Sequence, residues 1–240
     1  MGTAIGLGLL PNILRLLTGI RSMINTEYLF EKLLSYCKDI QGVDEQVLDA
    51  HLQKHGLTLR PDHRSFLLKY GNSNQLLKAD YGDCTYAMFE KYTSNPQKYM
   101  SGFDELPDGT VFFGQEFSEE LLCIENESGK LYTYDSKELL DYYGESIDAL
   151  LFSWLVVYLS KYGVISSTQM RIVEKDDKEP FYQQHEAYHL SGLDNFFTKY
   201  FLKNNQLMRC RGSQDGTYDV HYFQGEILDS IAQEGLLFTS

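Results

Sequence analysis

The stretch LPDGTVFFGQEFSEELLCIENESGKLYTYDSK, residues 106–137, contains three short apolar runs separated by turn-forming residues. The runs lie at residues 111–113, 121–124 and 131–134, and Gly, Asp, Asn and Ser lie between them. These residue types accept the backbone angles of tight turns, and apolar runs of this length are typical of β-strands. The stretch therefore predicts a hairpin or a three-stranded meander.

The same region carries most of the negative charge of the chain. Twelve carboxylates and two lysines lie between residues 104 and 145, whereas the formal net charge of all 240 residues is −13. Such a composition argues against nucleic-acid binding, which requires lysine and arginine at the phosphates. It favours a basic partner, although carboxylates at strand ends and turns also serve simply to keep the edge of a sheet soluble.

Length and cysteine content limit the class of protein. With 43% hydrophobic residues, the chain is long enough to bury a core, as one large domain or one domain with an appendage. Its four cysteines are far apart in sequence and form no Cys-x-x-Cys pair. This spacing indicates free thiols in a reducing compartment, so we expect a cytoplasmic protein without a zinc–thiolate site and without a cofactor.

Residues 1–25 differ in composition from the rest, because they contain no acids, two arginines and an apolar run. The apolar residues fall on one helical face, so the segment predicts an amphipathic helix or a poorly ordered leader. Pro11 and Arg15 interrupt it, and it is too short for a membrane span. A peripheral membrane anchor is the third interpretation, but we expect no membrane partner.

Two helices are predicted between residues 26 and 56. Thr26 fits the N-cap of the first, and Asp44 and Gly56 fit the N-cap and the C′ residue of the second. His51 and His55 are four residues apart on the second helix. Because no acid or cysteine completes a ligand set, we interpret them as surface or core-edge histidines.

The segment LTLRPDHRSFLLKYGN, residues 57–72, predicts a helix that starts at Pro61 and stops at Gly71. Phe66, Leu67 and Tyr70 form its buried face. Its Leu-x-Pro start, its central aromatic residue and its Leu-Leu-x-Tyr-Gly end resemble the N-terminal signature of the SUKH superfamily, which contains bacterial toxin-immunity proteins related to a yeast regulator of cell-wall synthesis.

The central stretch is similar to the second signature of that superfamily. It has Phe112-Phe113-Gly114, then a strand, then a Gly129-Lys130 turn and a Leu-Tyr strand that ends near Asp135. The two signatures cover roughly residues 44–160 in the expected order. The resemblance implies an α+β fold, with an antiparallel or mixed sheet packed against helices over residues 26–163.

The remaining elements are predicted from patterns alone. Residues 76–89 favour a strand pair, and residues 146–162 favour a buried core helix capped by Ser146, since almost all of its positions are apolar. Residues 164–240 predict an extension that packs on the domain or forms a small subdomain, with a helix–hairpin–helix order. That extension comprises a charged linker at residues 175–179, a helix capped by Asp194-Asn195, a hairpin over residues 206–223 and a last helix over residues 224–233.

A competing motif lies in this extension. His185, Glu186 and His189 fit H-E-x-x-H, the spacing that places two zinc-binding imidazoles on one helical face with the glutamate as general base. A zinc metalloprotease is therefore an alternative function. However, Asn195 stands where the extended pattern has a third histidine, so the favoured interpretation is a solvent-edge helix with two histidines and no metal.

The leading hypothesis is a non-catalytic immunity protein, an antitoxin that binds and neutralises a cognate protein toxin. The resemblance implies this class, and a dense acidic surface with tyrosines suits a basic, nuclease-like partner. A non-catalytic regulatory scaffold is the third alternative. The predicted partner-binding residues are the acids and tyrosines of the central region: Tyr81, Asp83, Glu116, Glu119, Glu120, Glu125, Glu127, Tyr132, Tyr134 and Asp135.

Overall fold

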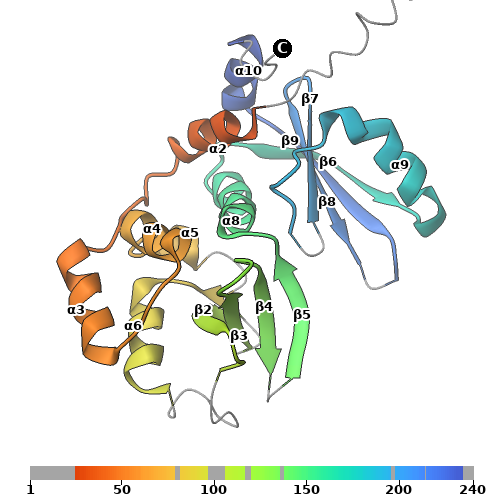
Figure 1. Cartoon of the computed structure of the whole chain (residues 1–240). Coiled ribbons are helices and arrows are strands. Elements are labelled where there is room, and N and C mark those ends of the chain that lie inside the picture. Colours follow the sequence, from red (N-terminus) through yellow and green to blue (C-terminus); the bar gives the residue numbers. More distant parts are fainter. Residues whose placement is uncertain are drawn as a thin grey trace, which may run out of the picture.

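The computed structural model describes residues 25–78, 82–96, 106–116, 120–135, 138–195, 198–213 and 215–234, and of residues 135 and 138–141 only the backbone. Its first layer is the predicted meander, extended at both edges (Figure 1). Every neighbouring pair is antiparallel, in the order β1-β2-β3-β4-β5. The five strands are β1 (Gly82–Asp83), β2 (Thr110–Glu116), β3 (Leu121–Glu125), β4 (Leu131–Asp135) and β5 (Glu138–Gly144).

The helices that cover this sheet come from the N-terminal part of the chain. Asp44 accepts hydrogen bonds from two backbone N–H groups of the next helix, and Gly56 ends that helix with a φ of 62°, so both predicted caps are confirmed. Asn25, rather than Thr26, caps the first helix. These helices are α2 (Thr26–Leu34), α3 (Glu45–His55), α4 (Pro61–Tyr70), α5 (Asn74–Leu77) and α6 (Tyr86–Ser94).

The strand pair predicted for residues 76–89 is wrong except for the two residues of β1. Leu76 and Leu77 belong to α5, and the Thr85 hydroxyl accepts a hydrogen bond from the Met88 N–H and so starts α6. Local capping therefore outweighs the apolar content of this segment. The ring of Tyr92 on α6 stacks on Phe112 of β2, with 3.8 Å between the ring centroids.

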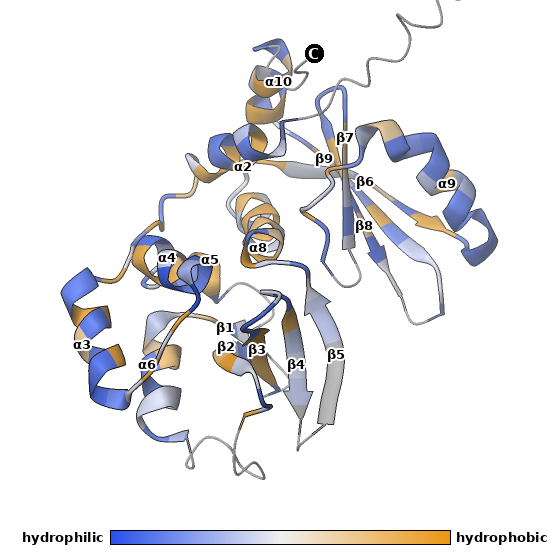
Figure 2. Ribbon diagram, in the orientation of Figure 1, coloured by the Kyte–Doolittle hydropathy of each residue, from blue (hydrophilic) through white to orange (hydrophobic). Residues whose placement is uncertain are grey.

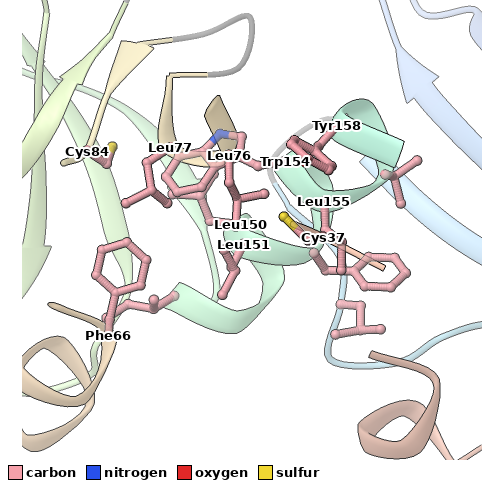
Figure 3. Packing of buried hydrophobic residues seen from close by; sticks show 14 of the residues in the cluster. Cys37, Phe66, Leu76, Leu77, Cys84, Leu150, Leu151, Trp154, Leu155 and Tyr158 are labelled. Carbon is pink, nitrogen blue, oxygen red and sulfur yellow. The ribbon is translucent and has the colours of Figure 1, made fainter. Parts of the chain in front are cut away.

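The central helix is α8 (Ile147–Lys161), which lies between the two sheets (Figure 1). Ser146 caps it as predicted, accepting a hydrogen bond from the Ala149 N–H. Figure 2 shows α8 as mostly hydrophobic, whereas α9 is mostly hydrophilic. In Figure 3 its Leu150 and Trp154 lie beside Leu76 and Leu77. An almost entirely apolar helix is buried on most sides, and this is what the structure shows.

The second sheet is antiparallel and has the order β6-β9-β8-β7. The predicted hairpin over residues 206–223 is confirmed as β8 and β9, and the last predicted helix is α10. The charged segment predicted as a linker is the short 3₁₀ helix η1 and the start of α9. The elements are β6 (Ser166–Val173), η1 (Lys175–Asp177), α9 (Lys178–His185), η2 (Glu186–Tyr188), β7 (Thr198–Lys203), β8 (Gln206–Gly212), β9 (Tyr218–Gln224) and α10 (Glu226–Gln233).

The helix predicted after Asp194-Asn195 is wrong, because residues 198–203 form strand β7. Tyr200 and Leu202 point to the α8 side of the sheet, while Phe201 packs under α9. A strand buried on both faces has no alternation of polar and apolar residues, so its sequence pattern is easily mistaken for that of a helix. The predicted helix–hairpin–helix order is thus a four-stranded sheet with two helices.

One hydrophobic core joins these elements. It contains α8, the inner residues of both sheets, and α2 and α10, while a smaller cluster lies between the outer face of the second sheet and α9. The Tyr28 hydroxyl donates a hydrogen bond to Glu234, and Lys32 forms an ion pair with the same carboxylate at 2.9 Å. These contacts join α2 to the end of α10. Within the described residues, no helix is long and apolar enough to cross a membrane.

Candidate functional site

Two turns and the start of helix α4 meet at one end of the five-stranded sheet. The Asn126 N–H, between β3 and β4, donates to the Gly109 carbonyl at 2.8 Å, which joins this turn to the one before β2. Arg60, at the start of α4, donates to the Asn126 and Glu127 carbonyls. We call this region the loop end and define it by the charged residues Arg60, Asp62, Asp108, Glu125, Glu127, Lys130 and Glu145.

Gly129 makes the close approach of Arg60 possible. It has a φ of 77°, and a Cβ added there would lie 2.7 Å from an Arg60 guanidinium nitrogen. Only glycine combines the left-handed backbone with this contact. The sequence pattern places Gly129 in a turn, but no local pattern indicates a role for Arg60, because the carbonyls that Arg60 binds are more than sixty residues away in sequence.

The charges of the loop end are partly compensated, and carboxylates remain in excess. Arg60 forms an ion pair with Asp62 at 3.0 Å, and Lys130 forms one with Glu145 at 3.4 Å. Burial would raise the pKa of Asp62, but the hydrogen bonds from Arg60 and from the His63 N–H outweigh it and lower that pKa. Asp108 and Glu127 are exposed at the tips of their turns. The loop end therefore presents net negative charge on an ordered backbone.

Two tyrosines lie next to these carboxylates. The rings of Tyr132 on β4 and Tyr142 on β5 meet edge to face at 6.0 Å, and both residues are half-buried. The hydrogen bond from Tyr142 lowers the pKa of Glu145, while burial, followed by that same bond, raises the pKa of Tyr142. Tyr134, also predicted as a contact residue, is only 8% exposed. Tyr132 and Tyr142 are thus the aromatic residues that remain accessible here.

The other predicted contact residues that the structure describes lie at the opposite end of the sheet. Asp83 forms an ion pair with Lys78 at 3.3 Å and accepts hydrogen bonds from Thr85. The Glu116 N–H donates to the Glu120 carbonyl at 2.8 Å, next to β1. Because the five residues of β3 span about 13 Å, antiparallel pairing divides the predicted acids into two groups. Tyr81, Glu119 and the Asp135 side chain lie outside the described residues.

The H-E-x-x-H segment does not form the helix that a zinc site requires. Helix α9 ends at His185, residues 186–188 form the 3₁₀ helix η2, and His189 is extended with a ψ of 130°. His189 forms a β-bridge with Phe201, which draws it out of the helix. The two imidazoles therefore do not share one helical face.

Each of these histidines has its own partner. The His185 Nδ1 donates to the Phe181 carbonyl at 2.8 Å, and its ring is buried against the Phe181 ring. The His189 Nε2 lies 2.8 Å from an Asp194 oxygen, with Tyr182 next to its other nitrogen. The predicted solvent-edge position is wrong for His185. Among the described residues, no group of three or more His, Cys, Asp or Glu side chains is arranged to hold a metal ion.

The cysteines are buried and reduced. All four thiols are free and all four cysteines are buried. Burial raises the pKa of Cys123 and of Cys210 to about 12, so neither thiol is a nucleophile near neutral pH.

Comparison with models of protein families, with characterised proteins and with solved structures finds no match for this chain. The resemblance to the SUKH superfamily therefore stays a prediction that rests on the two sequence signatures. In the structure, Pro61 is the first residue of α4, Gly71 follows its last residue, and the Gly129-Lys130 turn connects β3 to β4.

Proposed function

We propose that this chain is a non-catalytic immunity protein that neutralises a basic protein toxin, and that the loop end is its contact surface. The observation that carries the proposal is that the exposed Asp108, Glu127 and Glu145 lie at the same end of the sheet as Tyr132 and Tyr142. Arg60 ties the β3–β4 turn at this end to α4. A cytoplasmic location and a nuclease-like partner belong to the same proposal.

The physical argument has two parts. Exposed carboxylates on a chain of formal charge −13 attract a basic protein at separations up to about one Debye length. This attraction raises the association rate. Half-buried tyrosines supply contact area at little cost in side-chain entropy. Once they are packed against the partner, the complex dissociates slowly. Turns already held by hydrogen bonds lose little conformational entropy on binding.

The test measures association with a basic protein toxin, if one is encoded next to this chain. The variant Asp108→Lys/Glu127→Lys reverses two exposed charges at the loop end, and Asp176→Lys/Asp177→Lys is the matched control on η1. We expect the loop-end variant to slow association about tenfold at low salt, with a smaller effect at about 0.3 M salt, and the control to change it by less than about twofold.

Equal effects of the two variants would contradict the loop end as the contact surface. Absence of a toxin, together with binding to an endogenous enzyme or structural protein through the same residues, would favour the regulatory scaffold instead. The geometry does not support the zinc protease alternative, since His185 and His189 do not share a helical face.

A further inference from the structure

A groove of about 500 Å³ lies between the last turns of α8 and the second sheet. Val157 and Phe223 form its apolar part, while Ser160 from α8 and Ser167 from β6 contribute hydroxyl groups. The groove thus combines an apolar surface with hydrogen-bonding groups on two sides. This combination is typical of sites for small molecules.

The charged groups of the groove are basic. Lys161 comes from α8 and Arg209 from β8, and His221 of β9 is the direct cross-strand neighbour of Arg209. No carboxylate is among the described lining residues, although the whole chain has a formal charge of −13. Two cations and an imidazole gathered in such an acidic protein indicate an anionic ligand.

Arg209 has an unfilled hydrogen-bonding position. Its Nε is buried and has no partner among the described residues, and its guanidinium carbon lies 5.7 Å from the centre of the Phe223 ring. A buried N–H without an acceptor is unfavourable, and most buried polar atoms in proteins are paired. Arg209 thus has hydrogen-bonding capacity that no described residue uses, and an oxyanion in the groove would interact with its guanidinium group.

His221 adds a third donor. Its ring stacks near that of Phe223, with 6.2 Å between centroids and 21° between planes. The partial negative charge of the α8 C-terminus opposes anion binding, but a helix end carries only about half an elementary charge, against two full charges on Lys161 and Arg209. The balance of charge at the groove is therefore positive.

We propose that this groove binds a small ligand that carries an oxyanion, a phosphate or a carboxylate, on an apolar body. Lys161, Arg209 and His221 hold the oxyanion, and Val157 and Phe223 contact the apolar body. The proposal does not depend on the immunity function, because none of the loop-end residues lines the groove.

The test is a titration of the purified chain with three matched probes: phenyl phosphate, benzoate and phenol. We expect one or both anions to saturate a single site, with phenol at least about tenfold weaker because it lacks the oxyanion. The stronger of the two anions identifies the natural ligand as phosphorylated or carboxylated. Isothermal titration calorimetry measures the dissociation constants.

Two variants and one control locate the site. Arg209→Met and Lys161→Met each weaken binding of the preferred anion about tenfold. Arg171→Met is the control, because Arg171 is exposed and points to the other face of the same sheet; its effect stays below about twofold. Since Lys161 is exposed, Lys161→Met decides the question even if Arg209→Met does not fold.

Three results would overturn the proposal. They are the failure of both anions to saturate at millimolar concentration, equal binding of phenol, and anion binding that Lys161→Met leaves unchanged.

Discussion

The two sheets of this protein are both antiparallel, yet they relate to solvent in opposite ways. In β3, at the centre of the first sheet, residues 121–124 are all buried, so both faces are covered. In β6, at the edge of the second sheet, only Val173 is buried, and Met170 and Ile172 are 60% and 54% exposed. The central strand of the first sheet is thus buried, and the exposed polar groups of that sheet lie at its turns. The second sheet, by contrast, exposes part of one face to solvent.

The largest expected contrast between the sheets is in stability. Phe113→Ala removes a ring that contacts His63 and Phe66 at centroid distances of 5.1 and 5.0 Å, and should lower the free energy of unfolding by about 3–5 kcal/mol. Ile172→Ala on β6 should change it by less than about 0.5 kcal/mol, since that side chain is already hydrated. Urea unfolding of both variants measures the contrast, and similar losses would contradict it.

The second prediction concerns the stability of the folded protein at acidic pH. His63 is fully buried, has no hydrogen-bond partner for either ring nitrogen among the described residues, and burial lowers its pKa from 6.5 to about 4. Because the folded state holds this imidazole neutral, its contribution to the free energy of unfolding is complete above pH 6.5 and is lost as the pH falls through about 4. The loss amounts to about 3 kcal/mol.

The variant His63→Phe tests this contribution, because phenylalanine keeps the aromatic contacts with Phe89 and Phe113 and cannot take up a proton. Its free energy of unfolding should fall less steeply than that of the wild type between about pH 6.5 and about pH 4. Parallel pH profiles of the two proteins would show that His63 does not titrate as described.

A smaller effect is expected at the loop end. Arg60→Met removes the hydrogen bonds to the Asn126 and Glu127 carbonyls and should lower the free energy of unfolding by about 1 kcal/mol. Hydrogen exchange of the amides in the β3–β4 turn should also become faster than in the Arg171→Met control. Unchanged exchange in this turn would mean that Arg60 does not order it.

The smallest prediction concerns the groove of the second sheet. Burial, and next Arg209, lower the pKa of His221, while Asp219 on the same strand opposes this shift. A bound anion favours the protonated ring, so benzoate, which is ionised throughout, should bind about threefold more tightly near pH 6 than near pH 8. His221→Gln should remove the pH dependence.

Local signals predicted much of the fold. The caps Asp44, Gly56 and Ser146 lie where their residue types indicated, and β2, β3 and β4 coincide with the apolar runs between turns. The prediction failed where burial on both faces removed the usual pattern, as in β7, and where capping by Thr85 produced a helix in place of a strand. Contacts with distant elements decided the outcome for β7, whereas a local hydrogen bond decided it for α6.

The candidate sites were harder to predict than the fold. Asp108 and Glu127 are close because two turns are hydrogen-bonded, and the acids of β2 and β3 separate because antiparallel strands run in opposite directions. The groove unites residues 157–161 with Arg209 and His221, which no motif in the sequence connects. The H-E-x-x-H motif, by contrast, is visible in the sequence, but it does not form one helix because His189 forms a β-bridge with Phe201 of β7.

By itself, the amino-acid sequence determined the strongly negative charge, the buried central helix, the helix caps and the turns of the first sheet, because these depend on composition and on neighbours within a few residues. Only the tertiary structure decided which charges meet. Arg60 reaches the turn of β3 and β4, His63 is enclosed by aromatic rings, and Arg209 lines the same groove as Lys161. Such pairs depend on how separate elements pack, and no local pattern along the chain encodes that packing.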